Sequence, residues 1–125
     1  MRIAWVFALA WACGSAAAAP VHPEVGASQE GKATWYSDSL AGHATASGET
    51  YDPDELTAAH RTLPFGTRVR VTRLDTERSV EVRINDRGPF GRRDRILDLS
   101  RAAAEALDMI QAGVVRVRLE VLEVP

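Results

Sequence analysis

The sequence lacks several features that would point to familiar kinds of chemistry. It has one cysteine, Cys13, so no internal disulfide framework is expected. Its three histidines, His22, His43 and His60, are far apart, and neither a His-Glu-x-x-His pattern nor a pair of cysteines at zinc-ligand spacing is present. A Gly-x-Ser-x-Gly nucleophile elbow and a glycine-rich phosphate loop before a helix are also missing. We therefore expect no metal, no cofactor and no activated serine.

An excess of positive charge is missing as well. The chain has 15 lysines and arginines against 17 acidic residues, which argues against nucleic acid as a partner. Arginine supplies all but one of the basic residues and often alternates with valine, a pattern typical of the solvated faces of strands. Arg92, Arg93 and Arg95 lie closer together. They either contact an anionic polymer or belong to an ordinary solvated loop.

The N-terminal apolar run, residues 3–12, is too short for a permanent membrane anchor. It follows Arg2 and precedes a stretch of small residues, which is typical of an export signal. We expect a signal peptidase to cleave near Ala18 or Ala19. The alternative is lipidation of Cys13, because residues 9–13 loosely resemble a bacterial lipobox. The sequence thus predicts an exported protein of the periplasm or cell envelope, either free or held to the membrane as a lipoprotein.

The chain divides into three parts. Residues 1–19 are the expected signal peptide, and residues 20–30 have the Pro, Gly and polar content of a flexible linker. Residues 31–124 are long enough for one domain with a modest core, and we expect that domain to be a monomer.

This domain reads as mainly β. Alternating patterns predict a first strand at residues 31–37, a hairpin at 67–74 and 79–85, and strands at 95–99 and 114–124. Ser100 is the expected N-cap of a helix at 101–107, and Asp52 that of a single helical turn at 53–56. A small β-barrel with one or two short helices buries such half-apolar strands without leaving open edges.

Acid–base residues remain as candidates for chemistry. Asp86 ends an alternating strand just before Gly88-Pro89; by itself it reads as a turn carboxylate that binds its own backbone. Glu49 by itself reads as a surface carboxylate. His60 has small and polar neighbours rather than an apolar stripe, which favours a role in a site. Tyr36 and its neighbour Trp35 point to opposite faces of their strand, so one of them is core and the other can face a groove.

Four stretches carry a resemblance to a known family: TASGE (45–49), LTAAHRTLPFGT (56–67), RINDRGPF (83–90) and ILDLS (96–100). In this order they closely resemble the rare lipoprotein A (RlpA-like) family of bacterial cell-wall proteins, and the likeness runs from about residue 31 to residue 122. The resemblance implies a six-stranded double-psi β-barrel and an endolytic lytic transglycosylase, a lyase that acts on peptidoglycan and prefers glycan strands without stem peptides.

The resemblance also implies the site. By motif position, the functional residues of the family correspond to Glu49, His60 and Asp86. We expect Ser47, Asn85 and Arg87, which lie in these motifs, and Tyr36 of the expected first strand to contact substrate. The chain departs from the family pattern at Ser37 and Leu40, where a glycine and an aromatic residue are usual. Larger members carry a C-terminal glycan-binding repeat domain, and a sequence that ends at Pro125 is expected to lack that means of reaching the division septum.

The implied mechanism uses Asp86 as general acid and base, His60 to orient Asp86 or the sugar, and Glu49 to hold substrate or tune Asp86. A nearby Arg83 or Arg87 would lower the pKa of Asp86 and so oppose its acid role. Two other functions stay open. One is a hydrolase in which Glu49 or Asp98 activates water, and the other is a non-catalytic, expansin-like module that only binds glycan.

Overall fold

The computed structural model describes residues 23–125, so the expected signal peptide, its cleavage region and Cys13 lie outside the described residues. The described chain forms six strands and two short helices: β2 (Ser28–Trp35), η1 (Asp38–Leu40), β3 (Thr57–Ala59), β4 (Arg68–Arg73), β5 (Ser79–Asp86), β6 (Arg95–Leu99), α2 (Arg101–Ala106) and β7 (Val115–Glu123). The helix η1 is a single 3-10 turn. No helix within residues 23–125 is long and apolar enough to cross a membrane.

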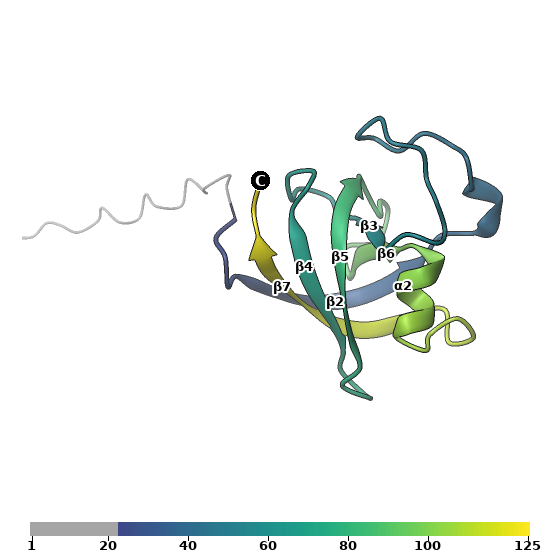
Figure 1. Cartoon of the computed structure of the whole chain (residues 1–125). Coiled ribbons are helices and arrows are strands. Elements are labelled where there is room, and N and C mark those ends of the chain that lie inside the picture. The colour runs from purple at the N-terminus through teal and green to yellow at the C-terminus, as the bar shows by residue number, and fades with distance from the viewer. Residues whose placement is uncertain (1–22) are drawn as a thin grey trace, which may run out of the picture.

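The strands close into a barrel in the order β2-β6-β3-β5-β4-β7. Two pairs, β2 with β6 and β3 with β5, are parallel, and the other four are antiparallel. Figure 1 shows the strands wrapping around one another, with α2 against one side and the long β2–β3 connection extending away from the barrel. The predicted fold class is confirmed: the domain is a closed, mixed, six-stranded barrel of the double-psi kind with one short α-helix.

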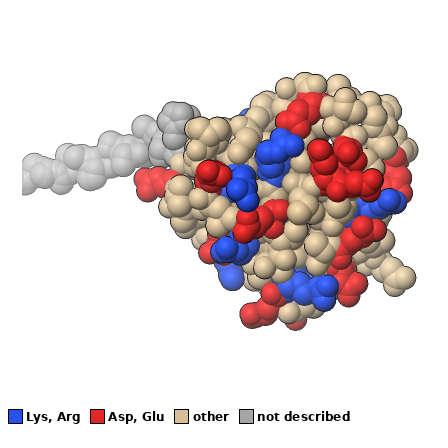
Figure 2. Space-filling model, viewed as in Figure 1, with Lys and Arg blue, Asp and Glu red and all other residues tan. Residues whose placement is uncertain are grey.

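The core lies inside the barrel, where the alternating patterns place it. Val69 and Val71 of β4 and Val82 and Ile84 of β5 are buried, while their arginine and glutamate neighbours face outward. Four residues of β7 do the same: Val115, Val117, Leu119 and Val121. On the face shown in Figure 2, basic and acidic side chains are interspersed. Arg68, for example, pairs with Glu81 at 2.8 Å.

Helix α2 begins where its capping residue predicts. The hydroxyl of Ser100 accepts a hydrogen bond from the amide of Ala103, as an N-cap does. The same hydroxyl accepts the amide of Thr57 at 3.3 Å, which ties the helix to β3. The buried Ala103, Ala104 and Leu107 close one side of the core.

Two sequence-based boundaries differ from the structure. β2 begins at Ser28 rather than at residue 31, because residues 28–30, although polar and exposed, pair with Glu120, Leu119 and Arg118 of β7. Backbone pairing needs no apolar pattern, so periodicity misses these residues. The helical turn expected at 53–56 is an ordinary turn: Asp52 does accept the amide of Asp54 at 2.9 Å, but no helix follows.

Candidate functional site

A row of residues crosses four strands at one end of the barrel. Asp86, the last residue of β5, lies beside Ala59 of β3; Ala59 pairs with Asp98 of β6, and Asp98 with Thr34 of β2. Directly paired residues share one face of a sheet. Asp98 stands between two core leucines, so this is the outer face. The small side chain of Ala59 therefore separates two carboxylates on the barrel surface.

A register shift aims Asp86 at this face. Ala58 pairs with Ile84, but the next residue of β3, Ala59, pairs with Asp86, so Asn85 is one extra residue in β5. Such bulges change which face a side chain occupies. Ile84 points into the core, and in a regular strand without the register shift Asp86, two residues later, would point inward as well.

Three donors hold the carboxylate of Asp86. The hydroxyl of Tyr36 donates to Oδ2 at 2.6 Å, and the amides of Ala46 and Arg87 each donate to Oδ1 at 2.8 Å. Burial and the neighbouring charge of Asp86 raise the pKa of Tyr36 well above its usual value, so the phenol keeps its proton at neutral pH. The position and orientation of Asp86 are therefore fixed by the β2–β3 connection, which supplies Tyr36 and Ala46, and by the residue that follows Asp86.

The carboxylate lies in the wall of a small cavity of about 190 Å³. The rings of Tyr36 and Tyr51 meet edge to face there, with centroids 4.8 Å apart. The other lining residues come from the β2–β3 connection: Leu40, His43, Ala44 and Thr45. Tyr36, one of the two neighbouring aromatic residues of which one was expected to face a groove, thus lines a cavity next to Asp86.

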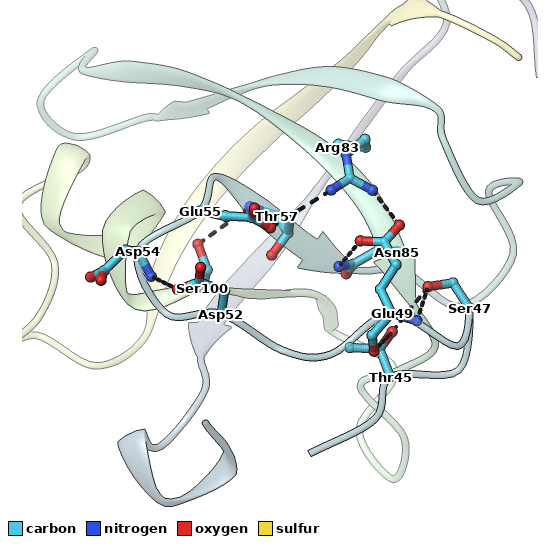
Figure 3. Close-up of polar contacts among 10 residues, drawn as sticks. All are labelled: Thr45, Ser47, Glu49, Asp52, Asp54, Glu55, Thr57, Arg83, Asn85 and Ser100. Carbon is cyan, nitrogen blue, oxygen red and sulfur yellow. Dashed lines mark hydrogen bonds and ion pairs between the residues drawn. The ribbon is translucent and has the colours of Figure 1, made fainter. Parts of the chain in front are cut away.

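Glu49 lies in the same region but does not contact Asp86. Its carboxylate accepts hydrogen bonds from Arg83 at 2.6 Å and from the amide of Asn85 at 3.3 Å, as Figure 3 shows. These donors, Arg83 first, hold the pKa of Glu49 below its usual range. The amide of Ser47 also donates to the Asn85 carbonyl at 3.3 Å. Glu49 therefore fastens the turn at residues 45–49 to β5, and this turn supplies the Ala46 amide that binds Asp86.

His60 adjoins Asp86 through the backbone only. Its amide donates to the Asp86 carbonyl at 3.1 Å, while its ring lines a different hollow, between the start of β2 and β7. Nδ1 accepts the amides of Thr62 and Leu63, both at 3.1 Å, so the ring proton is on Nε2, 2.9 Å from Oε1 of Gln29. Burial, with the positive charges of Arg61 and Arg87, lowers the pKa of His60 to about 4. The ring is neutral near pH 7.

Arg83 and Arg87, the two arginines nearest to Asp86 in the sequence, direct their guanidinium groups to other partners. Arg83 pairs with Glu49, and Arg87 donates to the carbonyls of Leu63 and His60 and lies 4.0 Å over the ring of Phe65. Within the described part of the chain no ion pair involves Asp86. The backbone of Arg87 serves the site, whereas its guanidinium holds the β3–β4 connection.

The other expected contact residues are placed unequally. Ser47 lies at the turn, where its hydroxyl is within 3.0 Å of the Thr45 hydroxyl. Asn85 is only 2% exposed and its amide is used by Glu49. The sequence did not identify Thr34, whose hydroxyl donates to Asp98, and it named Asp98 only as an alternative base. Strand register brings both into the row, and no spacing in the sequence carries that information.

Within residues 23–125 no group of three or more His, Cys, Asp or Glu side chains is arranged to hold a metal ion. The groups available at this end of the barrel are carboxylates, phenols, backbone amides and the imidazole of His43. Such a set can exchange protons with a bound substrate and can bind its hydroxyl groups.

Comparisons with known proteins agree with this picture. A family model described as "Lytic transglycolase" matches residues 28–119. The endolytic peptidoglycan transglycosylase RlpA of Campylobacter jejuni is 50% identical over 103 residues, which are 82% of this chain and 37% of that protein. The probable endolytic peptidoglycan transglycosylase RlpA of Nostoc sp. is 58% identical over 95 residues, 74% of this chain and 25% of that protein. The chain thus spans between a quarter and two-fifths of the length of these relatives.

Solved structures show the same barrel. The Streptomyces papain inhibitor superposes with a TM-score of 0.64 at 26% identity, covering 79% of this chain and 97% of that one. An expansin of Clavibacter michiganensis superposes with a TM-score of 0.63 at 23% identity, covering 79% and 52%. These two likenesses support the fold.

Proposed function

Since the chain belongs to the lytic transglycolase family, with RlpA proteins among its relatives, we propose that it cleaves the glycan strands of peptidoglycan. The bond cut is the one between N-acetylmuramic acid and N-acetylglucosamine, and the product ends in 1,6-anhydro-N-acetylmuramic acid. The preferred substrate is a strand that has lost its stem peptides. The site of action is the cell envelope.

The observation that carries this proposal is the fixed carboxylate of Asp86 beside a cavity lined by two tyrosines. Protonated Asp86 gives its proton to the glycosidic oxygen as the C1–O bond breaks. The C6 hydroxyl of the same muramic acid residue attacks C1, and the Asp86 carboxylate accepts the proton of that hydroxyl. The nucleophile belongs to the substrate, so one carboxylate suffices, whereas ordinary glycosidases need two.

Tyr36 serves both protonation states of Asp86. A hydroxyl group can donate to a carboxylate and can accept from a carboxylic acid, so the contact at 2.6 Å persists as Asp86 loses and regains its proton. Glu49 and His60 act as positioning residues in this scheme, because each holds a loop next to Asp86 rather than touching its carboxylate. Tyr36 and Ser47 face the substrate; Asn85 and Arg87 support the site from within.

Asp98 favours a second candidate function, a hydrolase. It is the only other carboxylate in the row of paired residues through Asp86, so it can act as the base that activates water. Hydrolysis leaves a reducing end where transglycosylation leaves an anhydro end. A third outcome, binding without cleavage, would make the domain a glycan-binding module.

One experiment separates these functions. Peptide-free glycan strands are incubated with the wild-type protein and with Asp86→Asn, and the fragments are analysed by mass spectrometry. We expect anhydro ends, 18 Da lighter than the hydrolysis product because one water is not added, from the wild type only. Reducing ends would select the hydrolase, and equal product from both proteins would remove Asp86 from the mechanism. Stable binding to sacculi with no soluble product would show that the domain is a glycan-binding module without catalytic activity.

The route to the envelope is a separate proposal. We propose export by a cleaved signal peptide, with cleavage near Ala18 or Ala19. Mass spectrometry of the mature N-terminus tests it. A diacylglycerol on an N-terminal Cys13 would show instead that the protein is a lipoprotein.

A further inference from the structure

The connection between β5 and β6 carries charge and aromatic surface that the proposed chemistry does not use. Phe90 is 73% exposed, and Arg92 and Arg93 are exposed beside it. Together with Gly91 and Arg61 they line an open hollow of about 540 Å³. Phe90 is the most exposed of the large hydrophobic side chains among residues 23–125, and it lies beside two exposed cations.

This connection is held in one shape by Arg61. Its guanidinium donates to the carbonyls of Pro89 and Arg95, both at 2.7 Å, and to those of Arg93 at 3.1 Å and Arg92 at 3.3 Å. A single side chain thus organises the backbone along the connection. A surface that is already ordered loses less entropy when it binds a ligand.

The cations in this segment differ in what they contact. Arg92 pairs with Asp94 at 3.3 Å. Arg93 makes no ion pair and its side chain no hydrogen bond with any residue from 23 to 125. Arg93 is thus the cation left available to a ligand in the hollow beside Phe90.

The ligand must offer an anion close to an apolar surface. In a glycan strand the C–H face of a pyranose ring can stack on an aromatic ring, and each muramic acid residue bears a lactyl group. When the stem peptide has been removed, the lactyl group ends in a free carboxylate; when the peptide is present, that carboxylate is a neutral amide. Arginine is well suited to binding a carboxylate.

We propose that residues 87–94 form a subsite for one peptide-free muramic acid residue, with Phe90 against the sugar and Arg93 on its lactyl carboxylate. The inference rests on the proposed action on glycan strands and supplies a physical reason for a preference for strands without peptides. The place in the fold is suitable, since the segment starts directly after Asp86 and leads into β6, which bears Asp98. A strand bound in the hollow can therefore continue toward the row of paired residues.

The test compares two substrates and four proteins. The substrates are peptide-free glycan strands with free lactyl carboxylates and the same strands after conversion of those groups to methylamides. The proteins are the full-length wild type, Arg93→Gln, Phe90→Ala, and Arg78→Gln as a matched control at the opposite end of β5. Dissociation constants and kcat/KM are both measured, and thermal unfolding verifies that each variant is folded.

We expect the wild type to bind the free carboxylate strands up to about fivefold more tightly than the methylamides, the upper end of the range for an exposed ion pair. Arg93→Gln should lose this preference and leave methylamide binding unchanged, and Phe90→Ala should weaken both. Arg78→Gln should match the wild type. Equal binding of the two substrates by the wild type, or an equal loss in Arg93→Gln and Arg78→Gln, overturns the subsite. Binding with this pattern but without cleavage would refute the enzymatic function and retain the subsite.

Discussion

Asp86 and His60 are joined by a backbone hydrogen bond, yet their side chains lie in opposite surroundings. The Asp86 carboxylate borders a cavity and receives donors from three places. The His60 ring, 6% exposed, accepts two amides of its own turn and donates to Gln29. The Asp86 carboxylate is held where a substrate can reach it. Both nitrogens of the His60 ring are engaged in hydrogen bonds that stabilise the local backbone. From the sequence we expected both residues to take part in one reaction, whereas their contacts indicate a reactive role for Asp86 and a structural role for His60.

The replacement Asp86→Asn gives the largest expected effect and tests the reactive half of this comparison. An amide cannot donate and regain a proton at neutral pH, so kcat/KM on peptide-free strands should fall by about 10³-fold. The amide oxygen can still accept the Ala46 or Arg87 amide, so the free energy of unfolding should change by less than about 1 kcal/mol. Urea titration beside the kinetic assay measures both. A large loss of stability would mean that Asp86 is a structural residue like His60.

The structural half is tested by His60→Ala. This change leaves the amides of Thr62 and Leu63 without their acceptor and should cost about 2–3 kcal/mol of stability. His60→Asn is the matched control, because its side-chain oxygen can take the place of Nδ1 and should restore part of that stability. Residual activity, measured where each variant is folded, should follow stability. If the His60→Asn protein were stable but fully inactive, His60 would have to take part in the reaction itself.

A pH titration of stability sharpens the same point. The pKa of His60 is lowered to about 4 in the folded protein, against about 6.5 in an unfolded chain. Between these values the unfolded state binds a proton that the folded state does not, so stability is complete above about pH 6.5 and falls as the pH drops toward 4, by up to about 3 kcal/mol. Urea titrations at several pH values measure this slope. Carboxylates also titrate near pH 4, so the slope must be compared with that of His60→Asn. The slope of this variant should be shallower. Identical slopes would contradict the conclusion that burial lowers the pKa of His60.

Tyr36→Phe tests whether the neighbour of Asp86 belongs to the reactive side. The change removes the hydroxyl that donates to Oδ2 and keeps the ring. We expect kcat to fall by about tenfold, KM to change little, and stability to drop by about 1 kcal/mol. An unchanged kcat with a raised KM would make Tyr36 a substrate contact only.

The smallest effect is expected for Glu49→Gln, because the pair with Arg83 is partly exposed. Stability should fall by less than about 1 kcal/mol, and activity by about threefold, since a looser turn holds the Ala46 amide less firmly against Asp86. Glu55→Gln is the matched control, since Glu55 reaches the same guanidinium only at 3.9 Å. If Glu49→Gln were as inactive as Asp86→Asn, Glu49 would itself take part in the reaction.

The sequence predicts the regular parts of the fold well. β4, β5, β6 and β7 follow from alternation, and α2 from the capping residue Ser100, because each of these signals is local. The start of β2 and the turn after Asp52 were wrong, because pairing with β7 decides the first and the absence of further helix contacts the second. The six-stranded, double-psi form of the barrel rested on the family resemblance and is confirmed by the structure.

The site was less accessible to sequence reasoning. Asp86 was found at its strand end, and Tyr36 was named as an expected substrate contact, which stays a prediction. The amide of Ala46, the placement of Asp98 and the carbonyl contacts of Arg61 depend on which backbone segments meet. Backbone groups are nearly the same in every residue, so the residue types do not indicate which backbone groups will contact a given side chain.

The register shift at Ala58 and Ala59 has a consequence for how this barrel accommodates a site. Up to Ile84, every second side chain of β5 belongs to the core, and beyond Asn85 the sides are exchanged. The two demands on β5, folding and reaction, are thus kept apart by the register shift. Substitutions in the first part of the strand change stability and those in the second change chemistry; without the register shift, strict alternation would place Asp86 on the core side together with Ile84, and both demands would fall on the same face.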